Sequence, residues 1–208
     1  MSFVPTHEAL ERIARGEIVI VVDGPDREDE GDLTMSAEFA TPEALNFMIT
    51  HGRGLLCMPC EASRLDELRI GPMVRINDAS CDTPFGIPID HRSTTTGISV
   101  HDRAKTINAV LDVESRPWDF RRPGHVFPLR ARDGGVLERP GHTEASVDLC
   151  RTAGLRSVAV ICEVLNEDGT VARVPDLSRF AAHHGLAITT IDDLIAYRTS
   201  AESRAQLA

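Results

Sequence analysis

The chain places six carboxylates and one arginine in the ten residues Asp23–Asp32, directly after the uninterrupted apolar run Ile18–Val22. Such an apolar run predicts a strand buried on both faces, in a sheet covered by helices. Carboxylates this close together repel one another unless a cation neutralises them. Gly24-Pro25 and Gly31 favour turns and prevent a helix. We interpret the stretch as a shaped metal-binding loop at a strand end, with a solvated acidic turn as the alternative.

The composition indicates one soluble domain covering residues 1–208, with 42% hydrophobic and 26% charged residues. The net charge of −10 disfavours a nucleic-acid partner or an anionic membrane surface, because both require a dominant basic patch. A few arginines in a cleft can still bind a small anion. The chain has no secretory signal pattern and no apolar run of membrane-spanning length, so we expect a cytoplasmic protein.

The cysteines are odd in number and scattered, which fits a reduced cytoplasmic protein better than a disulfide scaffold. They are Cys57, Cys60, Cys81, Cys150 and Cys162. The spacing of Cys57 and Cys60 is that of a redox pair or half a zinc site, but no second pair at zinc spacing follows. We therefore interpret this pair as structural.

Apolar periodicity and capping signals predict alternating helices and strands. Helices are expected at 6–15, from Thr41 to just before Gly52, at 61–68, 100–111, from His142 onward, at 178–184 and from Asp192 onward. Strands are expected at 17–22, 33–38, 55–58, 85–90, in the segment that follows Arg122, at 157–165 and at 187–191. A hairpin turn is expected at 133–135. The pattern indicates the α/β (α+β) class: a mixed β-sheet covered by helices on both sides, as a single-domain α-β-α sandwich.

Three groups of polar residues stand out as candidates for chemistry. Glu28, Glu30 and Asp32 are spaced by two, so they would share one side of a locally extended loop. His125 and His142 each follow a glycine, where the backbone can approach a ligand closely. Each histidine alone is more typical of a structural residue.

Glu163 lies in an otherwise apolar run and is the third candidate. A glutamate on a buried strand must be paired, metal-bound or protonated, and each state tunes its pKa for proton transfer. These groups together suit metal-assisted proton transfer on an anionic polyol, such as enolisation of a phosphorylated sugar. The residues alone do not identify the product.

Six motifs in order resemble those of the 3,4-dihydroxy-2-butanone 4-phosphate synthase family, over essentially the whole chain. They are Asp26–Leu33, His51–Cys57, Thr95–Ser99, Arg122–Leu129, Gly141–Ala145 and Ile161–Glu163. The resemblance implies a lyase of riboflavin biosynthesis that converts D-ribulose 5-phosphate to L-3,4-dihydroxy-2-butanone 4-phosphate and formate. It also implies Mg²⁺ or Mn²⁺, two ions per active site, and a homodimer with sites near the subunit interface. The family reaction begins with loss of a C1 proton, continues through dehydration and a skeletal shift, and ends with loss of C4 as formate.

The resemblance also implies roles for individual residues. The metal ions would be held by Glu28 and His142. The substrate would be contacted by Arg27, Glu28, Asp32, His142 and Glu163, and its phosphate side by the wall Arg139, Pro140, Gly141, His142 and Thr143. Catalysis would depend on His125 and Glu163. Thr95 and Thr96 would help to bind phosphate, and Cys57 would line the site.

The chain departs from the family pattern in the acidic loop. Gly24 and Pro25 stand where the family usually has acidic residues, and Asp29 replaces a common asparagine. These changes bear on loop mobility and metal affinity.

The family's domain is fused in many organisms to a GTP cyclohydrolase II domain with a zinc-binding cysteine cluster. No such cluster follows in the 208 residues, so we expect a monofunctional protein. The alternatives are a metal-dependent sugar-phosphate isomerase or aldolase, which releases no formate, and a non-catalytic sugar-phosphate-binding protein.

Overall fold

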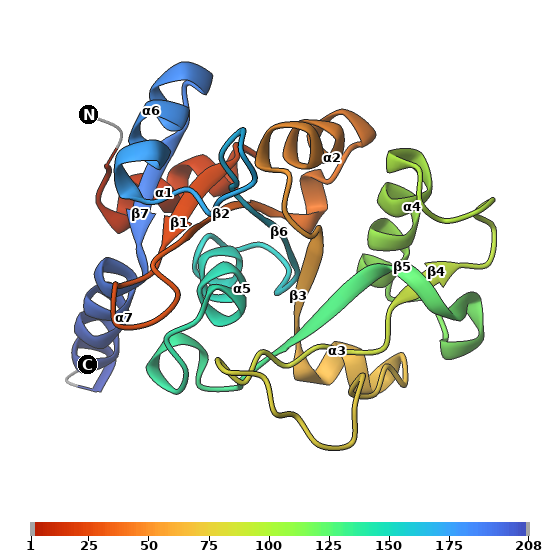
Figure 1. The fold of residues 1–208 in the computed structure, drawn as a ribbon. Helices are drawn as coiled ribbons and strands as arrows, with labels where there is room; N and C mark the ends of the chain where they lie inside the picture. The colour runs from red at the N-terminus through yellow and green to blue at the C-terminus, as the bar shows by residue number, and fades with distance from the viewer. Residues whose placement is uncertain (1–2, 207–208) are drawn as a thin grey trace.

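Seven strands form one mixed sheet in the computed structural model, which describes residues 3–206 (Figure 1). The strand order is β4-β5-β3-β6-β2-β1-β7; β1 pairs with β7 and β3 with β5 in parallel, and the other neighbours are antiparallel. The strands are β1 (Val19–Val22), β2 (Gly31–Ser36), β3 (Cys57–Glu61), β4 (Ile89–His91), β5 (Phe120–Ala131), β6 (Ala159–Glu163) and β7 (Ala187–Thr190). The mixed sheet is as predicted; of the expected domain, residues 1–2 and 207–208 lie outside the described part.

Seven α-helices surround the sheet within residues 3–206. They are α1 (Thr6–Ala14), α2 (Pro42–Phe47), α3 (Ala62–Glu67), α4 (Val100–Leu111), α5 (His142–Thr152), α6 (Val174–His184) and α7 (Ile191–Gln206). A π-helical turn, Met48–Gly52, continues α2. No helix in this part of the chain is both long enough and apolar enough to cross a bilayer.

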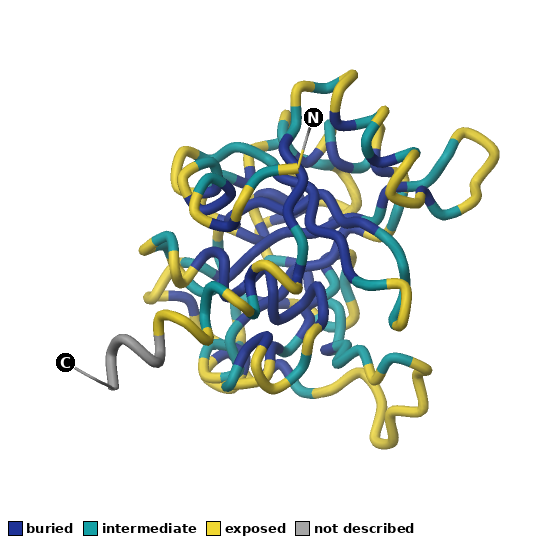
Figure 2. The backbone as a smooth tube through the Cα atoms, turned by 90° about the vertical axis from the view of Figure 1, so that its left-hand side faces the viewer, coloured by how far each residue is buried: buried dark blue, intermediate teal, exposed yellow. Residues whose placement is uncertain are grey.

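The sheet has an apolar layer on each face. On β1, Ile20 and Val22 belong to the cluster built with α2, α3, α4 and α6, whereas Val19 and Val21 belong to the cluster built with α1, α5 and α7. Successive strand residues point to opposite faces, so an unbroken apolar strand requires a cover on both. Buried backbone accordingly fills the centre of the molecule and exposed backbone its outer loops (Figure 2). The α-β-α sandwich is confirmed.

Local capping explains several helix boundaries that the sequence predicts. The Thr41 hydroxyl accepts from the Ala44 N–H at 3.2 Å, and the Ser99 hydroxyl accepts from the Asp102 N–H at 3.1 Å. Each cap satisfies one of the free N–H groups of a first turn. Gly185 ends α6 in the left-handed region with φ of 69°.

Five predicted elements differ in the structure. The helix expected at 178–184 begins earlier, at Val174, with a proline in its first turn. The hairpin turn at 133–135 is wrong: the chain continues into a 3₁₀ turn (Gly135–Leu137) leading to α5, held by a hydrogen bond from the Val136 N–H to Asp148 (2.9 Å). Of the predicted strand 85–90, only its end pairs in β4. β2 begins at Gly31, so Asp32 belongs to a strand rather than to the loop. The segment after Arg122 lies inside β5 rather than in a loop that precedes it.

Gly124 sets the contact between β4 and β5. A Cβ added there would lie 2.0 Å from the backbone carbon of Ile89, so Gly124→Ala forces the two strands apart. We expect the free energy of unfolding to fall by about 1–3 kcal/mol in chemical denaturation, as for other overpacked sites. Gly71→Ala is the matched control, since no atom lies within 4 Å of its added Cβ. Equal stability of the two variants would contradict the tight contact.

Candidate active site

The acidic loop between β1 and β2 is folded around Asp23. One oxygen of this carboxylate accepts from the Glu30 N–H at 2.9 Å, and the other accepts from the Glu28 N–H at 3.0 Å and from Arg27 Nη1 at 2.9 Å. Arg173 clamps the loop from outside by donating to the Glu28 carbonyl at 2.6 Å. The loop is therefore a turn, not the locally extended segment that the alternating carboxylates suggested.

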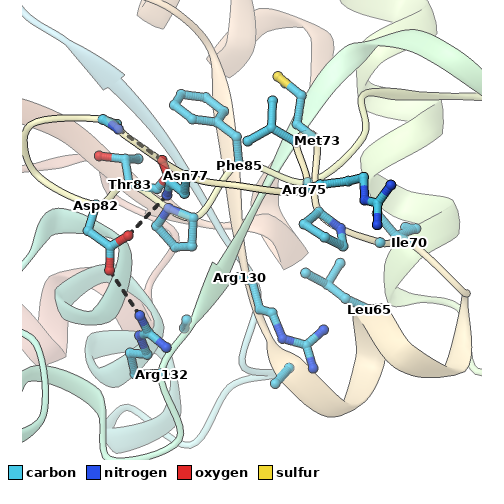
Figure 3. A pocket seen from close by; sticks show the side chains of 18 of the residues that line it. Leu65, Ile70, Met73, Arg75, Asn77, Asp82, Thr83, Phe85, Arg130 and Arg132 are labelled. Carbon is cyan, nitrogen blue, oxygen red and sulfur yellow. Dashed lines mark hydrogen bonds and ion pairs between the residues drawn. The ribbon is translucent and has the colours of Figure 1, made fainter.

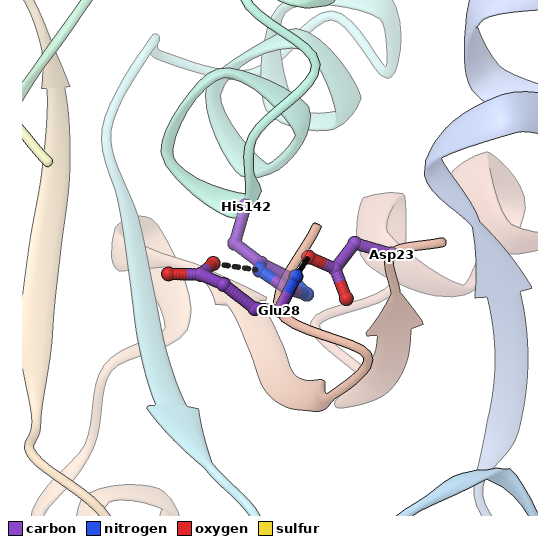
Figure 4. Close-up of side chains that lie close together, drawn as sticks. All are labelled: Asp23, Glu28 and His142. Atoms are coloured by element: carbon purple, nitrogen blue, oxygen red, sulfur yellow. Dashed lines mark hydrogen bonds and ion pairs between the residues drawn. The ribbon is translucent and has the colours of Figure 1, made fainter. Parts of the chain in front are cut away.

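The loop carries Glu28 toward His142, the first residue of α5 (Figure 4). Glu28 Oε2 lies 3.6 Å from His142 Nδ1 and 2.6 Å from Arg27 Nη1. Asp23, Glu28 and His142 each offer one potential ligand atom within 4.8 Å of the others. Sequence reasoning did not single out Asp23, although it stands at the strand end.

The structure distinguishes the roles of these three residues. The Asp23 oxygens already accept three N–H groups, so this carboxylate shapes the loop. His142 Nε2 is buried without a hydrogen-bond partner in the described chain. A buried unpaired imidazole nitrogen costs free energy, and binding a metal ion would relieve that cost. Glu28 and His142, the two predicted metal ligands, therefore fit a divalent ion.

Asp32 and Glu163 face each other across β2 and β6, in register. Their neighbours Leu33 and Cys162 belong to the cluster on the opposite face, so both carboxylates point to the α5 side. One Asp32 oxygen is buried without a partner in the described chain. Glu163 Oε2 accepts from the Leu55 N–H at 2.7 Å, and a Cβ on Gly54 would lie 2.4 Å from this oxygen. A glycine at 54 thus allows the backbone to hold the Glu163 carboxylate.

The buried charges shift one another's pKa values. Burial, followed by the charges of Glu163, Glu30 and Glu28, raises the pKa of Asp32 to about 7 against the opposing effect of His142. Burial lowers the pKa of His142, but the charge of Asp32 and the contact with Glu28 outweigh it and raise this pKa to about 9. The contact with His142 lowers the pKa of Glu28 to about 2, although burial opposes it. A carboxylate that titrates near neutrality is suited to proton transfer.

The residues predicted to contact the phosphate, 139–143, form the first turn of α5 and the segment before it. Gly141 precedes the helix, Thr143 is buried in its first turn and Pro140 is exposed. Arg139 Nη1 donates to the fully buried Glu144 at 2.6 Å, and Arg139 Nη2 donates to the Cys81 carbonyl at 2.8 Å. A helix amino terminus with an adjacent arginine is a favourable environment for an anion.

His125 lies on the same face but further along the sheet. Cys57 is in register with Phe127 on β5 and with Ile161 on β6. β3 thus lies between β5, which carries His125, and β6, which carries Glu163. The His125 side chain is 43% exposed. It is accessible from solvent and does not contact the carboxylate pair directly.

The weaker candidates have other partners within this chain. Cys57 is buried at the start of β3. Burial together with the charge of Glu163 raises the pKa of its thiol, so the side chain is neutral. The Thr95 hydroxyl and N–H donate to Asp102 at 2.6 and 3.2 Å, and the Gly97 N–H does so at 3.1 Å. This network stabilises the start of α4. Phosphate binding by Thr95 and Thr96 stays a prediction.

A cavity of about 620 Å³ lies elsewhere, between α3, the segment 70–86 and the end of β5 (Figure 3). None of the predicted site residues lines it. Of its three arginines, Arg130 and Arg132 are paired with Asp66 and Asp82 at 2.6 and 3.0 Å, and Arg75 is the third. The cavity is therefore separate from the cluster of charges formed by the predicted site residues.

Comparison with known proteins shows matches along nearly the whole chain. The model of the family described as 3,4-dihydroxy-2-butanone 4-phosphate synthase matches residues 7–197. The riboflavin biosynthesis protein RibBA of Bacillus subtilis is 55% identical over 196 residues, which cover 94% of this chain and 49% of the relative. That of Aquifex aeolicus is 55% identical over 205 residues, 97% of this chain and 50% of the relative. The chain thus spans about half the length of these curated relatives.

Solved structures give similar results. A 3,4-dihydroxy-2-butanone 4-phosphate synthase in complex with two magnesium ions superposes with a TM-score of 0.91 at 41% identity, covering 96% of this chain and 99% of that one. RibBX, a two-domain synthase from A. baumannii, superposes with a TM-score of 0.91 at 47% identity. This match covers 94% of the present chain and 58% of RibBX.

The charge balance around His142 can be tested by substituting Asp32. Removing this anion destabilises the protonated imidazole, so Asp32→Asn should lower the pKa of His142 from about 9 toward its ordinary value of 6.5. The pKa is measured by NMR titration of the imidazole in the metal-free protein with chelator present. Asp26→Asn is the control, because Asp26 is an exposed acid of the same loop. A His142 pKa that stays near 9 in Asp32→Asn would show that other groups hold the proton.

Proposed function

Because the chain belongs to the 3,4-dihydroxy-2-butanone 4-phosphate synthase family, we propose that it converts D-ribulose 5-phosphate to L-3,4-dihydroxy-2-butanone 4-phosphate and formate in riboflavin biosynthesis. One observation carries the proposal. Glu28 contacts His142 next to Asp32 and Glu163, which lie opposite each other on neighbouring strands. The reaction redistributes the atoms of one sugar phosphate between two products, so it needs proton transfers and no external oxidant. The site supplies titratable groups for those transfers.

Glu28 and His142 would hold Mg²⁺, the ion that the similar synthase binds as a pair. The unpartnered Nε2 of His142 and the carboxylate of Glu28, whose pKa of about 2 keeps it charged, are suited to a divalent cation. A bound ion supplies electrostatic stabilisation to substrate oxygens that become negative. Two ions per site, and Mn²⁺ as an alternative to Mg²⁺, are part of the proposal.

The carboxylates of β2 and β6 would move protons. Asp32 is buried and titrates near 7, so it can accept a proton from a substrate carbon or hydroxyl at neutral pH. Glu163 is held at one oxygen by the Leu55 N–H, which leaves its other oxygen to face the substrate. Arg27 bridges Asp23 and Glu28 and lies where it can bind a sugar oxygen.

The amino end of α5 would bind the substrate phosphate. Arg139 is oriented by Glu144 and the Cys81 carbonyl, and Thr143 lies in the first turn. Backbone N–H groups at a helix start favour a phosphate dianion. This end of the substrate is then fixed next to His142, so its carbons extend toward the carboxylates.

A cytoplasmic homodimer is the proposed form of the protein. All five cysteines are free, as expected in a reducing compartment. The exposed His125 is accessible either to its own chain's site or to that of a partner across a subunit interface. The proposal concerns the activity of this domain alone, because the chain covers only half of its RibBA relatives.

Carbon-13 NMR of ribulose 5-phosphate incubated with the protein and Mg²⁺ tests the function directly. We expect formate to appear together with a four-carbon phosphate, and both to stop on chelation. Isomerised pentose without formate would instead indicate the isomerase or aldolase alternative. An unchanged spectrum with excess Mg²⁺ would favour a binding protein.

Glu163→Gln should lower kcat for formate release by about 10²–10⁴-fold, the usual contribution of a positioned acid or base. The amide oxygen can still accept from the Leu55 N–H, so the fold is retained and the loss reports on the proton. Glu167→Gln is the matched control, since Glu167 is an exposed glutamate in the turn after β6. Activity of Glu163→Gln within about threefold of the control would rule out proton transfer by Glu163.

A further inference from the structure

We propose that Arg173, at the start of α6, is a positioning residue that holds the acidic loop closed and thereby sets the affinity of the site for its divalent ion. The closed loop is the conformation that places Glu28 beside His142. The inference rests on the proposed function for its metal ion and gives Arg173 no contact with substrate. Arg173 lies outside the six motifs and is 145 positions from Glu28 in the chain.

Arg173 binds the loop through main-chain carbonyls. Its Nη1 donates to the Glu28 carbonyl at 2.6 Å and also to the Asp29 carbonyl. Asp29 has a left-handed φ of 54°, and the turn of the backbone at this residue lets two successive carbonyls face the same donor. Because one of these carbonyls belongs to Glu28, the guanidinium fixes the backbone that carries a proposed metal ligand.

Helix α6 is a rigid support for this contact. Leu177 is fully buried in the apolar cluster on one face of the sheet. A Cβ on Gly31 would lie 2.6 Å from Leu177 Cδ1, so the helix packs directly against the chain where the loop enters β2. The Arg173 N–H donates to Asp176 at 3.1 Å, which fixes the first turn of α6. The guanidinium thus extends from a fixed helix to the loop residues 24–30, none of which is buried.

The ion pair between Arg173 and Asp29 contributes little to this support. Asp29 Oδ2 lies 3.7 Å from Arg173 Nη1, and the two side chains are 45% and 43% exposed. Water and salt screen an ion pair at this exposure. The two carbonyl contacts, rather than the pairing of charges, therefore hold the loop.

The direction of the effect on metal binding separates positioning from charge. A guanidinium repels a divalent cation, so its removal should tighten metal binding if charge were its only effect. Loss of positioning has the opposite result, because the apparent Kd rises by the inverse of the fraction of protein with a closed loop. Loss of a group that orients a metal ligand typically weakens binding about 10–100-fold. A fall of that size corresponds to a closed fraction of about 10% to 1%.

The test measures Mn²⁺ binding by electron paramagnetic resonance. Arg173→Gln removes the guanidinium but keeps the backbone N–H that donates to Asp176, and we expect its Mn²⁺ affinity to fall about 10–100-fold. Arg173→Lys keeps a charged donor and should recover part of the loss. Arg179→Gln is the matched control, since Arg179 is 73% exposed on the same helix and pairs with Asp176. Unchanged or tighter binding in Arg173→Gln would overturn the proposal.

Hydrogen exchange of the metal-free protein tests the loop without the ion. The N–H groups of Glu28 and Glu30 donate to Asp23 at 3.0 and 2.9 Å, so they exchange slowly while the loop is closed. We expect both amides to lose nearly all of this protection in Arg173→Gln and to keep it in Arg179→Gln. Wild-type protection in Arg173→Gln would contradict the proposal even if metal binding were weaker.

Formate kinetics separate this role from catalysis. In Arg173→Gln the Mg²⁺ concentration that gives half the maximal rate should rise about 10–100-fold, while kcat at saturating Mg²⁺ stays within about threefold of the wild type. A loss of kcat that saturating Mg²⁺ does not restore would overturn the positioning role. A wild type that binds no Mn²⁺ and makes no formate would reject the proposed function, and hydrogen exchange would still decide whether Arg173 holds the loop.

Discussion

Mutual repulsion of buried carboxylates is the constraint on which the site depends. Glu28 and Asp32 lie in the acidic loop and at the start of β2, and Glu163 ends β6; they converge on one face of the sheet. Asp32 is buried and the other two are half-buried, which weakens screening by water. His142 lies among them and carries the compensating charge, which explains its raised pKa. These carboxylates create a preference for a positive charge at the position of His142. A divalent ion that displaces the His142 proton satisfies the same preference.

The sheet order determines which residues can meet. β6 is inserted between β3 and β2, so Glu163 lies beside Asp32 on one side and the Gly54-Leu55 backbone on the other. α5 covers this part of the sheet, and its first residue, His142, reaches the loop that follows β1. Residues more than 100 positions apart are in this way fixed to within a few ångströms by rigid elements. Such fixed placement is what acid–base chemistry requires.

The departures in the acidic loop are accommodated structurally. Gly24 has open space around its Cα, and the turn 25–28 begins at Pro25, which suits the ring's fixed φ. Asp29 adopts the left-handed region with φ of 54°, a conformation that asparagine and aspartate tolerate better than most residues. The loop is further held by Asp23 and Arg173. The loop thus holds Glu28 beside His142 although Gly24 and Pro25 carry no charge.

The sequence by itself determined the sandwich, most element boundaries and the identity of the polar groups, because apolar periodicity, caps and glycines act over a few residues. The run Ile18–Val22 required cover on both faces, and Thr41, Ser99 and Gly185 marked helix ends. Motif resemblance supplied the roles that we propose for Glu28, His142 and Glu163. Only the tertiary structure decided that the hairpin at 133–135 does not form and that Asp32 and Glu163 are in register. Strand order and register depend on packing between distant segments, which no local pattern encodes.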